Sequence, residues 1–164
     1  LNQFEHAIET LEAAGDQAAA EAKRAEQAAF QFANLASRVE RYPNDLPLRF
    51  EYGVALFERD NLNDAIQQFQ MASRSPAERI RAMHYIGQCF HRKKQYDMAA
   101  DQLSKTAAEI PTMNDLRKEI LYELGQVYEE TGDKARALEQ FKAIYQVDVG
   151  FRDVATKIEQ GYAP

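Results

Sequence analysis

Three side chains that could do chemistry lie close together in the middle of the sequence: His84, Cys89 and His91. In a helix, the two histidines would share one face but lie about 10 Å apart along the axis. That distance is too long for both imidazoles to bind one metal ion, and no third ligand accompanies them at a suitable spacing. We therefore expect no metal site here.

The cysteine and the acidic residues are better explained by folding than by catalysis. Cys89 takes the place that Ala55 and Val127 take in the repeated pattern described below, so we predict a buried, inert thiol. The acidic pairs Glu129–Glu130 and Glu119 with Glu123 are most simply solvated helix faces. The sequence has no glycine-rich phosphate loop, no Gly-x-Ser-x-Gly elbow and no His-Glu-x-x-His motif. It gives no reason to expect an enzyme or a cofactor.

The composition excludes several other classes of protein. Of 164 residues, 45% are apolar and 28% charged, with only seven Gly and five Pro, which excludes a disordered or fibrous chain. A net charge of -6 argues against a general nucleic-acid binder, because such a protein needs surplus Lys and Arg. One cysteine cannot form an internal disulfide. No apolar run approaches the roughly 20 residues of a membrane span.

The beginning of the chain bears on its location. The first residue is Leu1, so we expect a fragment or a processed product. An upstream export signal or lipid anchor would then be missing from the sequence. On the residues present, we expect a cytoplasmic protein.

A pattern of small and bulky residues recurs three times. Each copy has a glycine, an alanine twelve residues later, and a bulky apolar residue four residues after that. The copies are Gly53, Ala65 and Phe69; Gly87, Ala99 and Leu103; and Gly125, Ala137 and Phe141. The first two copies are offset by 34 residues and the next two by 38. Agreement at three positions in three copies indicates a structural repeat.

Each copy is typical of two amphipathic helices joined by a polar turn. A glycine inside a helix costs about 1 kcal/mol relative to alanine, a cost that persists where a neighbouring helix must approach closely. The small alanine and the bulky residue one turn later fit the same packing. We predict helices over residues 45–59, 63–74, 76–93, 96–109, 115–131, 134–147 and 151–160, with no strands.

The segments between copies contain helix start signals. Asn44 or Asp45 can cap the first predicted helix. Residues 75–78, Ser-Pro-Ala-Glu, are typical of a capping box with Pro76 at the first helical position. The four extra residues of the second offset are expected in residues 111–115 or in the helix before them.

These positions resemble the tetratricopeptide repeat family. The resemblance rests on Gly53, Ala65, Phe69 and Ala72, on Gly87, Ala99, Leu103 and Pro111, and on Gly125, Gly132, Ala137 and Phe141. It covers about residues 44–148 and departs from the family pattern at Met83 and Leu121, where a large aromatic is usual, and at Pro76, one residue early. It implies a right-handed α-solenoid of antiparallel helix pairs, with repeats at 43–75, 76–111 and 112–149.

The end of the chain is similar to that of many bacterial members of the family. There, a final helix covers the open face of the last repeat, which implies a capping helix and tail over 150–164. Phe151, Val154 and Ile158 have the spacing of one apolar helix face, so the residues indicate the same helix independently.

The first 42 residues differ from the rest and allow two interpretations. A heptad-like seam is formed by Ala28, Phe32, Leu35, Val39 and Tyr42. In one interpretation, residues 28–42 are the second helix of a degenerate first repeat, packed under the helix at 46–59. In the other, residues 2–28 project as a long helix that pairs with a partner or a second copy.

The resemblance also implies a binding groove, because the first helix of each pair lines the concave side in this family. By register, the groove residues are Phe50, Val54, Phe57, His84, Gln88, His91, Arg92, Tyr122, Gln126 and Glu129. Aromatic rings, imidazoles and amides suit peptide binding. In the alternative, Phe50 or Tyr122 only packs between neighbouring helices. The clamp with which some members hold a C-terminal carboxylate has no matching residues here.

The charge is uneven, which bears on the partner. Residues 73–105 hold seven Lys or Arg against three Asp or Glu, while the flanks are acidic. This pattern either is random surface variation or favours a partner with an acidic stretch.

Our functional hypothesis is a scaffold that binds a segment of another protein in the concave groove. The alternative is a constitutive assembly subunit that uses the N-terminal helix and the outer faces. A regulatory module of a longer enzyme is a third interpretation. Neither nucleic acid nor a membrane span is expected.

Overall fold

The protein is described by a computed structural model in which residues 2–161 are placed. The regular secondary structure of this part of the chain is all helical, without strands. The helices are α1 (Asn2–Ala13), α2 (Gln17–Arg41), α3 (Leu46–Glu58), α4 (Leu62–Ala72), α5 (Arg79–Arg92), α6 (Tyr96–Ala108), α7 (Asp115–Glu130), α8 (Lys134–Tyr145) and α9 (Val154–Gly161). The prediction of an all-α fold is confirmed.

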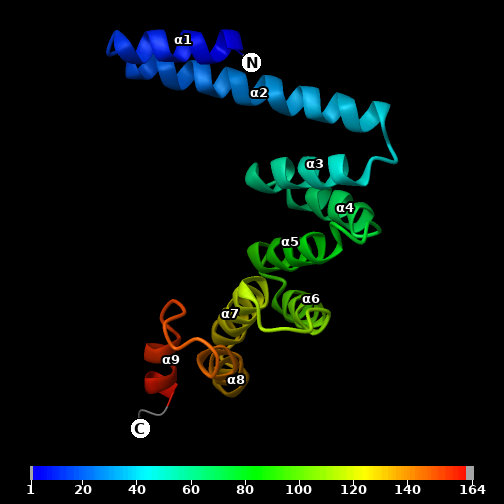
Figure 1. Cartoon of the computed structure of the whole chain (residues 1–164), viewed down its shortest axis with the longest axis vertical. Coiled ribbons are helices and arrows are strands. Elements are labelled where there is room, and N and C mark those ends of the chain that lie inside the picture. Colours follow the sequence, from blue (N-terminus) through cyan, green and yellow to red (C-terminus); the bar gives the residue numbers. More distant parts are fainter. Residues whose placement is uncertain (1, 162–164) are drawn as a thin grey trace.

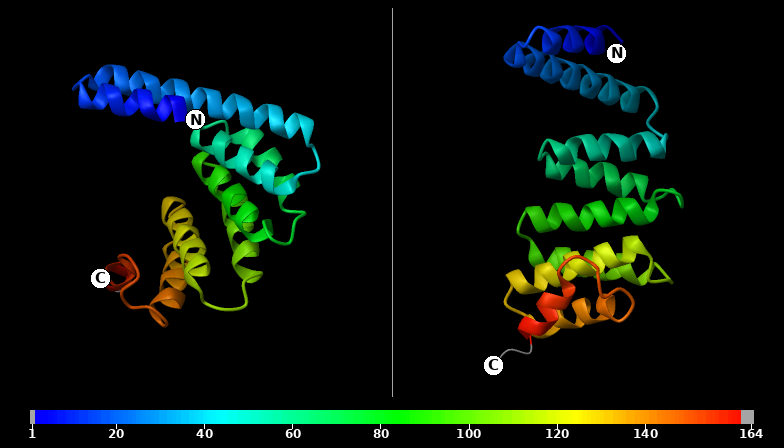
Figure 2. Two further views of the ribbon diagram at one scale, coloured as in Figure 1. Left: turned by 45° about the horizontal axis from the view of Figure 1, so that its top comes forward. Right: turned by 60° about the vertical axis from the view of Figure 1, so that its left-hand side comes forward.

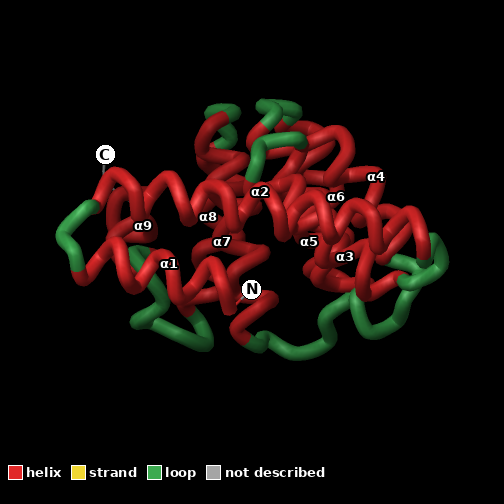
Figure 3. The backbone as a smooth tube through the Cα atoms, turned by 90° about the horizontal axis from the view of Figure 1, so that it is seen from above, coloured by secondary structure: helices red, strands yellow, loops and turns green. Residues whose placement is uncertain are grey.

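The helices form a stack of antiparallel pairs (Figure 1). The pairs α3–α4, α5–α6 and α7–α8 correspond to the three sequence copies, and the second helix of each pair packs against the first helix of the next. Seen from above, the stack is curved (Figure 3). The hairpin of α1 and α2 at one end and α9 at the other both extend on the side of α3, α5 and α7 (Figure 1). We call this side the inner side.

The three pairs share one packing device, as the sequence predicts. A Cβ atom added to Gly53 would lie 2.7 Å from the ring of Phe69, and one added to Gly125 would lie 2.5 Å from the ring of Phe141. In the middle pair, a Cβ atom added to Gly87 would lie 2.6 Å from the side chain of Leu103. Since such distances are far below van der Waals contact, only glycine lets the two helices of a pair approach this closely.

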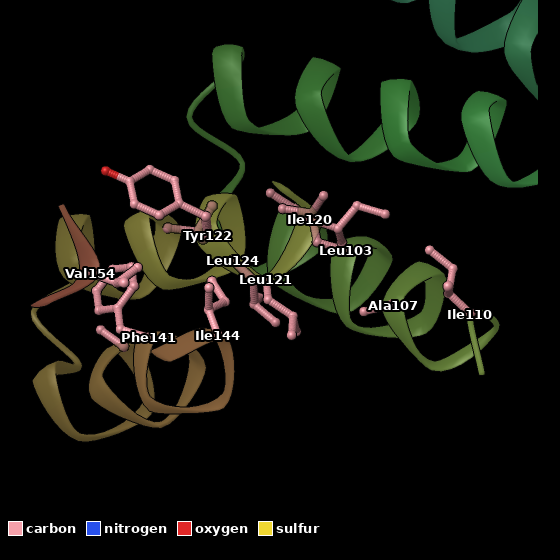
Figure 4. Close-up of a cluster of buried hydrophobic side chains, with 13 residues drawn as sticks. Leu103, Ala107, Ile110, Ile120, Leu121, Tyr122, Leu124, Phe141, Ile144 and Val154 are labelled. Atoms are coloured by element: carbon pink, nitrogen blue, oxygen red, sulfur yellow. The ribbon is translucent and has the colours of Figure 1, made fainter. Parts of the chain in front are cut away.

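The buried side chains form two clusters along the stack. The N-terminal cluster lies among α3, α4 and α5 and includes Phe50, Phe69 and Cys89. The C-terminal cluster runs from α6 through α7 and α8 to Val154 of α9 (Figure 4). Each cluster spans more than one repeat, because a single helix pair cannot bury its own apolar face.

The helix starts combine predicted and unpredicted features. Asp45 caps α3 by accepting a hydrogen bond from the Leu48 amide, as predicted. The prediction of a capping box at residues 75–78 is wrong. The amides of Glu78 and Arg79 both bond the carbonyl of Ser75 in a turn, so α5 begins at Arg79 instead of at residue 76.

The N-terminal segment is a hairpin, which corrects the interpretation in which residues 2–28 project as one long helix. The chain reverses at Gly15, whose φ of 76° is a left-handed conformation, and Asp16 caps α2. The helix α1 folds back on the first half of α2, with Phe4 against Phe30 (Figure 2). The second half of α2 packs on α3, as expected for a degenerate first repeat.

The predicted capping helix is present, but it starts later than expected. Residues 151–153 form a bend and turn in which Arg152 has a φ of 44°, so α9 begins at Val154 instead of residue 151. Val154 is completely buried in the C-terminal cluster. Residues 162–164, the end of the predicted tail, lie outside the described residues.

Candidate partner-binding surface

All ten residues predicted to line a groove lie on the first helices of the three pairs. Figure 2 shows these helices, α3, α5 and α7, following one another along the stack. Three of the residues are on α3, four on α5 and three on α7. The register taken from the sequence therefore places them on the predicted helices, but their surroundings differ strongly from helix to helix.

On α3, two of the predicted groove residues are buried. Phe50 and Phe57 are only 5% and 8% exposed. Their rings lie 5.7 and 5.1 Å from the ring of Tyr85 on α5, and Tyr85 in turn stacks on Phe69 at 4.8 Å. These aromatic side chains therefore hold α3 and α5 together. Of the three predicted groove residues on α3, Val54 is the one that is half-buried.

Two arginines of α5 cover the buried rings from the solvent side. The guanidinium of Arg81 lies 4.4 Å from the ring centre of Phe50, and that of Arg92 lies 3.7 Å from that of Phe57. Arg92 also donates to the Phe57 carbonyl at 3.1 Å, while its nearest carboxylate, on Asp60, is 4.0 Å away. A guanidinium stacked on a ring keeps its in-plane N–H donors available, so these arginines can donate hydrogen bonds to an anionic group.

Between α5 and α7, the predicted groove residues pair with carboxylates. His84 Nε2 lies 2.8 Å from Glu123, and Gln88 donates to the same carboxylate at 2.7 Å. His91 Nε2 lies 2.8 Å from Glu130. Both glutamates belong to α7, so these contacts close the inner side between the second and third pairs.

Between α7 and the C-terminal segment, the predicted groove residues Tyr122 and Glu129 also bond neighbouring side chains of the same chain. The hydroxyl of Tyr122, a residue 6% exposed, donates to Asp153 at 2.7 Å. Burial first, and then this bond to the carboxylate, raises the pKa of Tyr122 to about 12. Glu129 accepts from Lys157 of α9 at 2.8 Å. Gln126, between them, is half-buried.

The open part of the inner side therefore lies towards the N-terminus. One hollow, of about 410 Å³, is lined by Pro47, Phe50, Glu51, Val54, Glu78 and Arg81. A second, of about 440 Å³, is lined by Phe30, Gln31, Asn34, Leu35, Arg38 and Glu51. Phe50 and Val54 are predicted groove residues, whereas the contribution of α2 was not predicted from the sequence. Phe30 does not belong to the apolar seam of α2. A large apolar residue outside such a seam is a sequence signal for an exposed apolar surface.

Cys89 and the two histidines of α5 are either buried or hydrogen-bonded within the fold. Cys89 is fully buried, as predicted, and burial raises its pKa to about 12, so the reactive thiolate is scarce. His84 and His91 bond different glutamates. Within residues 2–161, no group of three or more His, Cys, Asp or Glu side chains is arranged to hold a metal ion. No described helix combines the length and apolarity needed to cross a membrane.

Comparison with known proteins identifies the fold. The sequence matches no family model and no curated protein sequence. In solved structures, MamA superposes with a TM-score of 0.68 at 19% identity, over 94% of this chain and 82% of that one. PilF of Pseudomonas aeruginosa gives 0.64 at 16% identity, over 98% and 66%. A tetratricopeptide repeat protein of Parabacteroides merdae gives 0.65 at 15% identity, over 98% and 59%.

These similarities define the class of the protein as a helical-repeat solenoid. The fold is the one seen in tetratricopeptide repeat proteins, as the resemblance in the sequence implied.

Proposed function

We propose that this protein is a docking scaffold that binds a segment of another protein on the inner side of the stack. The observation that carries the proposal is the pair of guanidiniums, Arg81 and Arg92, that cover buried aromatic rings on the open half of this side. A fixed cation next to apolar surface is the kind of anchor that concentrates binding energy in protein interfaces.

The chemistry of these anchors favours an acidic partner segment. Arg92 is exposed and bonds a backbone carbonyl, with its nearest carboxylate only at the limit of an ion pair. Arg81 is also exposed, and its bond to Glu78 is long, at 3.4 Å. A partner carboxylate would gain a charge-assisted hydrogen bond from either side chain without breaking a strong internal one.

The test uses peptides selected from a random display library against the intact protein, then synthesised with a fluorescent label. Arg92→Glu should weaken their binding about tenfold or more and reduce its dependence on salt. Lys105→Glu is the control, because Lys105 is exposed on α6 and, within residues 2–161, its ion-pair partner is the nearby Asp101. Binding that is insensitive to every inner-side substitution would reject the proposal.

One observation favours a second candidate, the assembly subunit. At about 1.5 Å per residue, α2 with 25 residues is roughly twice as long as α3 with 13, so it extends beyond the repeat it covers. Tyr42 at its end is 54% exposed. Light scattering after size exclusion separates the candidates: a monomer supports docking, and a stable oligomer supports assembly.

A further inference from the structure

The two hollows of the inner side are neighbours. Glu51 of α3 lines both of them, one on the side of α2 and the other on the side of α5. The strip that they form thus crosses three helices, from the hairpin to the second repeat. Figure 1 shows α2 directly beyond α3 in the stack, in the position from which it can form the end of this strip.

The apolar part of the strip is exposed on α2 as well as on α3. Phe30 is 54% exposed, even though its ring meets Phe4 at a centroid distance of 5.8 Å. Leu35 and Val54 are half-buried walls of the two hollows. An exposed aromatic ring at the edge of a concave apolar surface is a characteristic of a binding site.

Two charged side chains of the strip, one on α2 and one on α3, are unpaired in the described part of the chain. Within residues 2–161, neither Arg38 nor Glu51 forms an ion pair, although both line the same hollow. Arg81, at the other end, has only the long contact with Glu78. The strip therefore offers a cation at each end, with an unpaired carboxylate in the middle and the Glu78 carboxylate beside Arg81. This pattern differs from the rest of the inner side, where His84 and His91 already bond glutamates.

We infer that α2, α3 and α5 form one docking surface for an acidic partner segment with two apolar anchors. This inference rests on the proposed function and adds that the N-terminal hairpin is part of the site. The hollows lie on opposite sides of α3, and neighbouring helices pack 8–10 Å apart, so the anchors should be about 10 Å apart. Carboxylates outside the anchors meet Arg38 and Arg81, and a hydrogen-bond donor between them meets Glu51.

This geometry sets the sequence spacing that the partner must have. A spacing of about 10 Å is three residues in an extended chain and seven residues in a helix. In either conformation, acidic residues flank the two apolar ones. Peptides selected from the display library should therefore share this pattern, and a lysine-flanked version of the same peptide should lose binding.

The experiment measures the affinity of the selected, labelled peptides for substituted full-length protein. Phe30→Ala and Arg38→Glu should each weaken binding about tenfold or more. Tyr42→Ala is the matched control, because Tyr42 is equally exposed and follows the same helix but lies outside the strip. Its binding should stay within twofold of the parent.

Phe30 also contacts α1, so a second variant separates binding from folding of the hairpin. Phe4→Ala removes the same ring contact and leaves Phe30 in place. The inference expects Phe4→Ala to bind like the parent. If Phe4→Ala weakens binding as much as Phe30→Ala does, the effect belongs to the hairpin fold, and the assignment of Phe30 to the site is overturned.

The remaining outcomes distinguish the two proposals. If Phe30→Ala and Arg38→Glu bind like the parent while Arg92→Glu binds weakly, the hairpin is not part of the site and the proposed function stands. If none of these substitutions changes binding, both proposals fail. Selection of basic peptides would overturn the acidic chemistry even if the strip is the site.

Discussion

The contact between α3 and α5 and the contact between α5 and α7 occupy equivalent places in successive repeats. In the first, Phe50 and Phe57 pack on Tyr85 of the next repeat. In the second, the equivalent residues are His84 and His91, which form hydrogen bonds to glutamates. We call these the aromatic joint and the polar joint.

The residues that these side chains contact are equivalent as well. Tyr85 of the aromatic joint corresponds to Glu123 of the polar joint, and Arg92, which covers Phe57, corresponds to Glu130. Each corresponding pair is 38 residues apart, which is the offset between the two repeats. The glycine, alanine and bulky residue of each pair set the geometry, while the joint positions vary in chemistry. One backbone arrangement thus supports both a joint held by buried apolar area and a joint held by partly exposed hydrogen bonds. The proposed docking strip lies beside the first.

The largest expected difference comes from truncating one residue of each joint. Phe57→Ala should lower the free energy of unfolding by about 3–5 kcal/mol, because it removes a buried ring and leaves a cavity. His91→Ala should cost no more than about 1 kcal/mol, because its partner carboxylate is 46% exposed. Chemical denaturation of both variants measures the difference. Equal losses would contradict the division into an aromatic and a polar joint.

A smaller effect tests the scaffold that the two joints share. Gly53→Ala and Gly125→Ala should each destabilise by about 1–3 kcal/mol, because the new methyl group overlaps the ring of Phe69 or Phe141. Helix propensity alone predicts the opposite sign, by about 1 kcal/mol. Ser104→Ala, on an exposed part of α6, is the control and should be neutral or slightly stabilising. Stabilisation by either glycine substitution would show that the pairs are not this closely packed.

The sequence was sufficient for the repeats because the signals for them are local. Gly87, Ala99 and Leu103 repeat at fixed spacings, and the observed bounds of α3, α4, α6, α7 and α8 differ from the predicted ones by no more than two residues. The hairpin also has a local signal in the sequence, although the hairpin was not predicted. Gly15 followed by Asp16 is a turn followed by a helix cap, which ends one helix and starts another.

The candidate site was harder to predict because its residues depend on non-local neighbours. A residue at a groove position of the repeat can face either a ligand or the next repeat. Its position in the repeat does not distinguish the two cases. Phe50 is buried because Tyr85 lies opposite, and His84 is paired because Glu123 lies opposite. These pairs are 35 and 39 residues apart. The hollow beside Phe30 arises from how α2 meets α3, which periodicity does not specify.

The turns within the pairs allow a modest stabilisation. Asp60, Lys94 and Gly132 are equivalent, and all three have a left-handed φ, at 59°, 58° and 78°. Only the last is a glycine, so Lys94→Gly should relieve strain and stabilise the protein by about 0.5–1 kcal/mol, despite the extra freedom of the unfolded chain. Gly132→Lys should show the opposite sign. A thermal melt measures both, and destabilisation by Lys94→Gly would contradict the strained turn.

The smallest expected effect is the pH dependence of the polar joint. The hydrogen bond from His91 holds the pKa of Glu130 below its usual 4.5, and the hydroxyl of Tyr96 and the charge of Lys94 act in the same direction, while partial burial opposes them. A carboxyl group with a lowered pKa in the folded state stabilises that state above its unfolded pKa. This contribution is lost as the pH falls through the folded pKa, because the folded protein then takes up the proton as well.

The parent should therefore be more stable than Glu130→Gln at neutral pH, and the gap should close as the pH falls below 4.5, the usual pKa of a glutamate carboxyl group. Its size should stay below about 1 kcal/mol, since the carboxylate is 46% exposed. The measurement is urea denaturation of both proteins at a series of pH values. Phe57→Ala is the reference, because a buried phenyl ring carries no proton and its deficit should not follow this profile. A gap between the parent and Glu130→Gln that persists unchanged to pH 3 would show that the bond from His91 to Glu130 does not couple the second and third repeats in solution.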